Sequence, residues 1–147
     1  MTLTDQLSSD LKDAMRAGDT LRRDTLRMVL SAMQNRRIEA GEDLDDGQQL
    51  AVLMSAVKSR TDSATQYADN DRQDLADQEL AEIGVIQGYL PKQLGEEETL
   101  AIVRTKISEL GLTSKKEMGQ LMKAVMADHK GAADGKLVQR LAGQELA

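Results

Sequence analysis

One proline constrains the fold of this chain more than any other residue. Pro91 is the only proline among 147 residues, and it lies in the stretch that runs from Gly88 to Gly95. Because proline has no backbone N–H and its ring clashes with the preceding turn, a helix through residues 71–89 cannot continue past it. The three glutamates at 96–98 suit the positive end of a new helix. The stretch therefore predicts a hinge between two helical domains, residues 1–90 and 91–147.

The composition favours packed helices inside a cell. There is no Phe or Trp and there are two Tyr, so the core must consist of Leu, Ile, Val, Ala and eight Met, which suit helix packing. The absence of cysteine excludes disulfides and thiolate nucleophiles. No apolar run reaches the roughly 20 residues of a membrane span, and the amino terminus lacks a basic region followed by an apolar one. We therefore expect a cytoplasmic protein that is not bound to a membrane.

Apolar residues recur at helical spacing in seven segments. The predicted helices begin and end near residues 5–17, 19–40, 48–69, 71–89, 96–110, 114–129 and 135–146. The expected fold is therefore all-α. An N-terminal four-helix domain, arranged as an up-and-down bundle or as a pair of hairpins, precedes a C-terminal three-helix bundle.

Charge is distributed unevenly between the two predicted domains. The net charge is −6, of which residues 1–90 carry −7 and residues 91–147 carry +1. Within the second domain, residues 104–140 hold eight Lys/Arg against four Asp/Glu. This local excess of +4 is able to face a polyanion, although an ordinary solvated surface accounts for it equally well.

Motifs for catalysis, cofactors and metals are missing from the sequence. It has no phosphate-binding loop, no nucleophile elbow and a single histidine, His129, which suits the carboxyl end of a helix. The acidic runs at 43–46 and 96–98 are explained by a turn and a helix start. A stripe of Met118, Met122 and Met126 indicates core packing rather than a soft-metal site. We therefore predict no catalytic, cofactor-binding or metal-binding residues.

The segment from Lys130 to Lys136 is the strongest candidate for a binding site. A helix that begins here exposes backbone N–H groups, and neighbouring cations reinforce them, so the corner is suited to an RNA phosphate. The candidate RNA-binding residues are Lys123, Lys130, Gly131, Lys136 and Arg140. The alternative is an ordinary turn between helices, in which Gly131 ends one helix and Asp134 caps the next.

Several segments taken together resemble the YqeY family. They are Tyr89 to Leu94 followed by the glutamates at 96–98, Met118 to Met122, Lys130 to Val138, and the arginine-rich helix around Arg27. Residues 91–147 also resemble the tail of GatB, a subunit of the glutamine-dependent amidotransferase that corrects misacylated tRNA. Where the family usually has a cation after Lys130-Gly131, this chain has Ala132.

The resemblance implies an all-helical protein with a tail related to a tRNA-binding module. It implies tRNA, a tRNA-dependent amidotransferase or an aminoacyl-tRNA synthetase as the partner. It also carries an activity label, carbon–nitrogen ligation with glutamine as the amido donor, although the parts that perform this reaction have no counterpart here.

The leading hypothesis is a non-catalytic helical adaptor whose tail binds tRNA or a tRNA-handling enzyme. One alternative is an accessory component of glutamine-dependent amide transfer. Another is a protein-interaction module in which the arginines of the second helix meet an acidic partner. These arginines are Arg22, Arg23, Arg27, Arg36 and Arg37.

Overall fold

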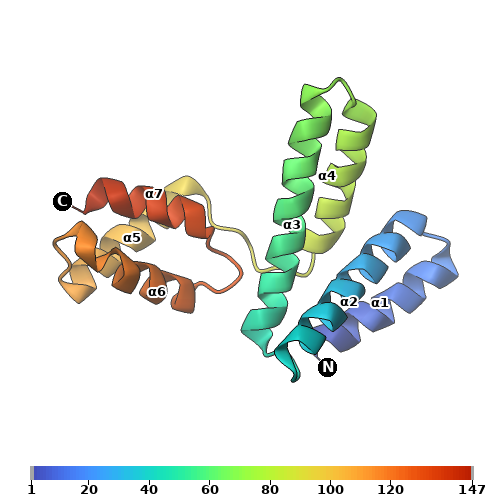
Figure 1. The fold of residues 1–147 in the computed structure, drawn as a ribbon, viewed down its shortest axis with the longest axis horizontal. Coiled ribbons are helices and arrows are strands. Elements are labelled where there is room, and N and C mark those ends of the chain that lie inside the picture. Colours follow the sequence, from blue (N-terminus) through green and yellow to red (C-terminus); the bar gives the residue numbers. More distant parts are fainter. Residues whose placement is uncertain (1, 147) are drawn as a thin grey trace. The chain divides into compact units, whose positions relative to one another are not determined.

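The all-α prediction is confirmed by the computed structural model, which describes residues 2–146 and contains no strand in that range (Figure 1). The helices are α1 (Leu3–Ala17), α2 (Thr20–Ala40), α3 (Asp46–Asp69), α4 (Gln73–Gln87), α5 (Glu96–Leu110), α6 (Met118–Asp128) and α7 (Gly135–Glu145). A short 3₁₀ helix, η1 (Lys115–Glu117), precedes α6. The chain divides into two compact units, Met1–Leu90 and Pro91–Ala147, called unit 1 and unit 2 below. None of the helices in the described range is both long and apolar enough to cross a membrane.

Unit 1 consists of two helical hairpins, α1–α2 and α3–α4 (Figure 1). Gly18 joins the first pair with a φ of 70°, a left-handed conformation that glycine adopts without a steric penalty. Thr2 caps α1 in a capping box with Asp5, so the helix begins at Leu3 rather than near residue 5 as predicted. The hairpins meet around a core of buried residues: Leu7, Leu26, Val29, Met33, Leu53 and Ile86.

The predicted break at the proline is confirmed. The α4 helix ends at Gln87 and α5 begins at Glu96, and Pro91 lies in the non-helical segment between them. Gly95 precedes α5 in an extended conformation and makes no side-chain capping bond. The glutamates at 96–98 occupy the first turn of α5, where their charge favours the helix dipole.

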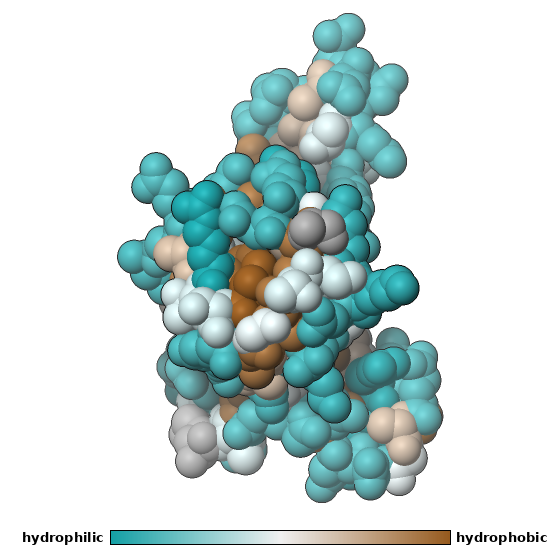
Figure 2. Space-filling view, turned by 90° about the vertical axis from the view of Figure 1, so that its left-hand side faces the viewer, coloured by the Kyte–Doolittle hydropathy of each residue, from teal (hydrophilic) through white to brown (hydrophobic). Residues whose placement is uncertain are grey.

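Unit 2 packs α5, α6 and α7 around a second core. Its buried residues include Val103, Leu121, Val125, Val138 and Leu141. The methionine stripe packs against this core, which confirms its interpretation as packing. On the face that Figure 2 shows, apolar side chains gather at the centre and hydrophilic ones surround them.

The start of α6 differs from the sequence prediction. Ser114 accepts a hydrogen bond from the Lys116 N–H, and Glu117 accepts one from the Thr113 N–H. Because both bonds tighten the backbone before Met118, residues 115–117 form a 3₁₀ turn instead of the first turn of an α-helix.

Candidate nucleic-acid interface

The segment that follows Pro91 is attached to the loop between α6 and α7. The Gln93 side chain donates from Nε2 to the Gly131 carbonyl at 2.5 Å, and the Leu94 N–H donates to the Ala132 carbonyl at 2.9 Å. Gly131 has a φ of 75°, which favours glycine at this turn. These contacts hold both segments at one end of unit 2.

Two helices begin at this end of unit 2. Asp134 caps α7 by accepting a hydrogen bond from the Lys136 N–H at 3.0 Å. The α5 helix is linked to α7 by an ion pair between Glu96 and Arg140, with 3.1 Å between the oxygen and the nitrogen. Both helices present the positive ends of their dipoles here, and the carboxylates already at these ends are the glutamates at 96–98 on α5 and the Asp134 cap of α7.

Lys130 and Gly131 of the predicted site lie in the α6–α7 loop, and Lys136 lies in the first turn of α7. Lys130 and Lys136 are exposed, whereas Gly131 is buried and its carbonyl already accepts the Gln93 bond. Lys123 is exposed on α6, roughly two helical turns before the loop. Arg140 pairs with Glu96, so its charge is already partly balanced within the unit.

One further lysine, Lys92, belongs near this site although the sequence alone did not point to it. It stands next to Gln93, in the segment attached to the α6–α7 loop. Lys116 is also exposed, but it lies in η1, at the other end of α6 from this loop. The position of Lys92 depends on the tertiary contacts that attach its segment to the loop.

The two units differ in how many of their Lys and Arg side chains form ion pairs with carboxylates. Within the described residues, seven of the ten Lys/Arg of unit 1 form ion pairs with carboxylates. In unit 2 only three of nine do so, namely Arg104, Lys106 and Arg140. The six lysines of unit 2 without such a carboxylate in residues 2–146 are Lys92, Lys115, Lys116, Lys123, Lys130 and Lys136. The positive charge able to meet a partner is therefore concentrated in unit 2.

The acid nearest to Lys130 in the sequence has another partner. Asp128 lies 2.5 Å from Lys106, and this hydrogen bond lowers the pKa of Asp128 and raises the pKa of Lys106. Asp128 thus pairs with Lys106, which also pairs with Glu109. The pairing of Asp128 leaves the exposed Lys130 ammonium free of this carboxylate.

The arginines of α2 are mostly paired inside unit 1. Arg22 pairs with Asp10, Arg23 with Asp24, Arg36 with Glu39 and Arg37 with Asp43. These pairs reduce the positive charge that an acidic partner would meet on α2. Exposed pairs of this kind add only about 0–1 kcal/mol each to stability.

The groups at this end of unit 2 are of the kind that bind an anion. Within residues 2–146, no group of three or more His, Cys, Asp or Glu side chains is placed to hold a metal ion. The features at this end of unit 2 are helix amino termini, backbone N–H groups and lysines, which bind anions without changing them covalently.

The fold and this site define an all-helical protein of two units, the second of which presents exposed lysines and, at one end, the amino termini of two helices. The chain belongs to the YqeY-like protein family, whose model matches residues 4–146.

Three relatives carry the name "Altered inheritance of mitochondria protein 41, mitochondrial". The protein from Kluyveromyces lactis is 34% identical over 123 residues, which cover 78% of this chain and 66% of the relative. The one from Lachancea thermotolerans is 40% identical over 85 residues, covering 57% and 46%. The one from Pyrenophora tritici-repentis is 28% identical over 138 residues, covering 92% and 76%. The matched regions thus span about half to two thirds of the first two relatives.

The cytoplasmic location expected from the sequence is wrong by this comparison. The relatives are named mitochondrial proteins. The expectation depended on composition and on the absence of cysteine, which indicate a reducing environment but do not distinguish one intracellular compartment from another.

Proposed function

We propose that the protein is a non-catalytic adaptor whose unit 2 binds tRNA. The proposal depends on one observation: six lysines of unit 2 have no carboxylate partner within the described residues, so their positive charge is available to a polyanion. Membership of the YqeY-like family, together with the resemblance of residues 91–147 to the GatB tail, supports tRNA as the polyanion.

Phosphate contacts dominate the proposed mode of binding. Lysine ammonium groups and the N–H groups at the start of α7 neutralise backbone phosphates, which releases counterions and makes binding weaken as salt increases. Stacking on exposed bases is not part of this mode, because unit 2 contains no aromatic residue. The contacts therefore favour the shape of a folded RNA over its base sequence.

A salt titration with deacylated tRNA tests the proposal on the full chain. Replacing Lys123, Lys130 and Lys136 with Ala should weaken binding and reduce the slope of log K against log salt by about 0.7–0.9 for each lost phosphate contact. The matched control replaces Lys12 and Lys58 of unit 1, both exposed and without an ion pair in the described chain. Salt-independent binding, or equal slopes for the two variants, would contradict the proposal.

An enzyme that handles tRNA is the other partner implied by the family resemblance. An amidation assay on misacylated tRNA, with and without this protein added to the other subunits, separates an accessory catalytic role from tRNA binding alone. A change in rate that survives the triple lysine substitution would favour the enzyme as the partner.

A further inference from the structure

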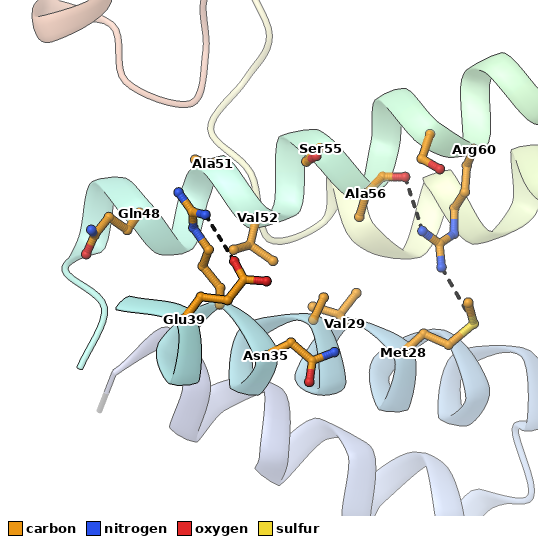
Figure 3. A pocket seen from close by; sticks show the side chains of 13 residues that line it. Met28, Val29, Asn35, Glu39, Gln48, Ala51, Val52, Ser55, Ala56 and Arg60 are labelled. Atoms are coloured by element: carbon orange, nitrogen blue, oxygen red, sulfur yellow. Dashed lines mark hydrogen bonds and ion pairs between the residues drawn. The ribbon is translucent and has the colours of Figure 1, made fainter. Parts of the chain in front are cut away.

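Unit 1 carries a groove between α2 and α3 that plays no part in the proposed RNA site. It has a volume of about 700 Å³. Its lining extends from Met28 to Glu39 on α2 and from Gln48 to Arg60 on α3 (Figure 3). At 1.5 Å per residue, these segments give a groove about 17 Å long, or roughly three helical turns.

Small side chains make the groove hollow. Ala51, Ser55 and Ser59 recur every fourth residue along α3, and Ala32 lies in the wall formed by α2. The apolar Val29 and Val52 also line it (Figure 3). Ala51 and Ser55 are exposed, so space remains above them.

A buried cation lies at one end of this groove. The Arg60 residue is only 9% exposed, and its Nε is buried without a hydrogen-bond partner in the described structure. One terminal nitrogen donates to the Ala56 carbonyl at 3.1 Å, and the other reaches only the thioether sulfur of Met28 at 3.6 Å. Glu82, on α4, forms an ion pair with Arg60, but the 3.9 Å between its carboxylate oxygen and Nε is too long for a hydrogen bond.

Met28 is the residue of α2 that contacts this guanidinium. Its thioether is a weak acceptor, its side chain is flexible, and the residue is 54% exposed. Figure 3 shows Arg60 reaching from α3 toward Met28 on α2. A carboxylate that displaces Met28 replaces a weak bond with a charge-assisted one.

We propose that the groove binds an amphipathic helix of a partner protein, with one Asp or Glu of that helix bound to Arg60. The backbone N–H and C=O groups of α2 and α3 are already hydrogen-bonded within each helix, so the groove offers no backbone partners to an extended strand. We therefore expect a helical occupant, because a helix forms its backbone hydrogen bonds internally. Nucleic acid would need positive charge at the rim of the groove, but Arg36 at this rim pairs with Glu39. Nucleic acid is therefore a poor match. The apolar face of the helix fills the space above Ala51 and Ser55.

A peptide selection on the full chain tests this proposal. A display library of 14-residue helix-forming peptides should yield sequences with apolar residues at i, i+3 and i+7 and one acidic residue near an end. A selected peptide is then synthesised with that residue as Glu and as Gln. The Gln form should bind the unchanged protein at least about 10-fold more weakly, and Arg60→Gln should abolish the difference.

Filling the groove provides a test that does not disturb the buried Arg60. Ala51→Leu and Ser55→Leu occupy the space above α3 at exposed positions and should remove peptide binding while helicity is retained. Ala68→Leu, also exposed on α3 but outside the groove, is the matched control and should leave binding unchanged.

Four results would overturn the proposal. The selection yields no peptide whose binding depends on Ala51 and Ser55, or it yields basic peptides only. The Glu and Gln forms of the peptide bind with equal affinity, or dodecanoate displaces the peptide. The last would assign the groove to a small carboxylate amphiphile. Loss of tRNA binding in the lysine variants has no bearing on these outcomes, because the groove lies in unit 1.

Discussion

Tyr89 connects distant parts of unit 1 through a single hydroxyl group. It donates to the Asp10 carboxylate of α1 at 2.5 Å and accepts from an Arg22 terminal nitrogen of α2 at 2.8 Å. The Arg22 guanidinium also lies 5.8 Å from the centre of the Tyr89 ring. Because Tyr89 follows α4 directly, this cluster fixes the end of unit 1 just before Pro91.

Removing this hydroxyl should destabilise unit 1. Tyr89→Phe leaves partly buried Asp10 and Arg22 without their shared partner, and we expect a loss of about 1–2 kcal/mol in the free energy of unfolding. Urea denaturation followed by circular dichroism measures it. Tyr67→Phe is the control, since Tyr67 is 36% exposed and should change stability by less than about 0.5 kcal/mol. Equal effects of the two substitutions would contradict the role assigned to the cluster.

The same hydroxyl should make stability depend on alkaline pH. Burial, and then the hydrogen bond to Asp10, raise the pKa of Tyr89 from 10.0 to about 12. Because the folded state holds the proton more tightly, this contribution is complete below pH 10 and is lost as the pH rises toward 12. The stability difference between the unchanged protein and Tyr89→Phe should therefore shrink across this interval. Absorbance titration in a Tyr67→Phe background, which leaves one tyrosine, measures the pKa directly.

Two glycines of unit 2 differ in backbone conformation, so replacing each with alanine should change stability in opposite directions. Gly131 has a φ of 75°, so Gly131→Ala should destabilise the unit by about 1–2 kcal/mol. Gly119 lies inside α6 with no neighbour within 4 Å of an added Cβ, so Gly119→Ala should stabilise it by about 0.5–1 kcal/mol. Thermal unfolding monitored by circular dichroism compares the two. Shifts of the same sign would show that backbone conformation does not decide the effect.

The elements were largely predictable because their ends depend on nearby residues. Asp134 caps α7 and α4 ends before Pro91, as the sequence indicated, and Asp19 caps α2 near its predicted start. Local capping also explains the error at α1, because the Thr2 cap starts this helix before the predicted residue 5.

The candidate site was predictable only in part. The segment from Lys130 to Lys136 is a local feature, but the Glu96–Arg140 pair joins residues 44 positions apart and arises from the packing of α5 on α7. The attachment of Gln93 to Gly131 and the buried Arg60 depend on tertiary contacts in the same way. Such contacts leave no periodic pattern in a single sequence.

The charge of the whole chain opposes the function proposed for one of its units. Unit 1 carries −7 and unit 2 carries +1, so a polyanion that approaches the lysines of unit 2 also experiences repulsion from the rest of the molecule. This repulsion extends about 30 Å at 0.01 M salt and about 10 Å at 0.1 M salt. It should therefore slow association with tRNA most strongly at low ionic strength.

Neutralising acids in unit 1 should speed the association of tRNA with the full chain. Glu42→Gln, Asp62→Asn and Asp69→Asn together change exposed residues outside the ion pairs of the described structure and bring unit 1 from −7 to −4. Stopped-flow measurements at 0.01 M salt should show an association rate several-fold higher than that of the unchanged protein, and the difference should disappear at 0.5 M salt. The dissociation rate should change little, because the lysines of unit 2 are untouched. Equal association rates at 0.01 M salt would mean that the charge of unit 1 does not act on the approaching RNA.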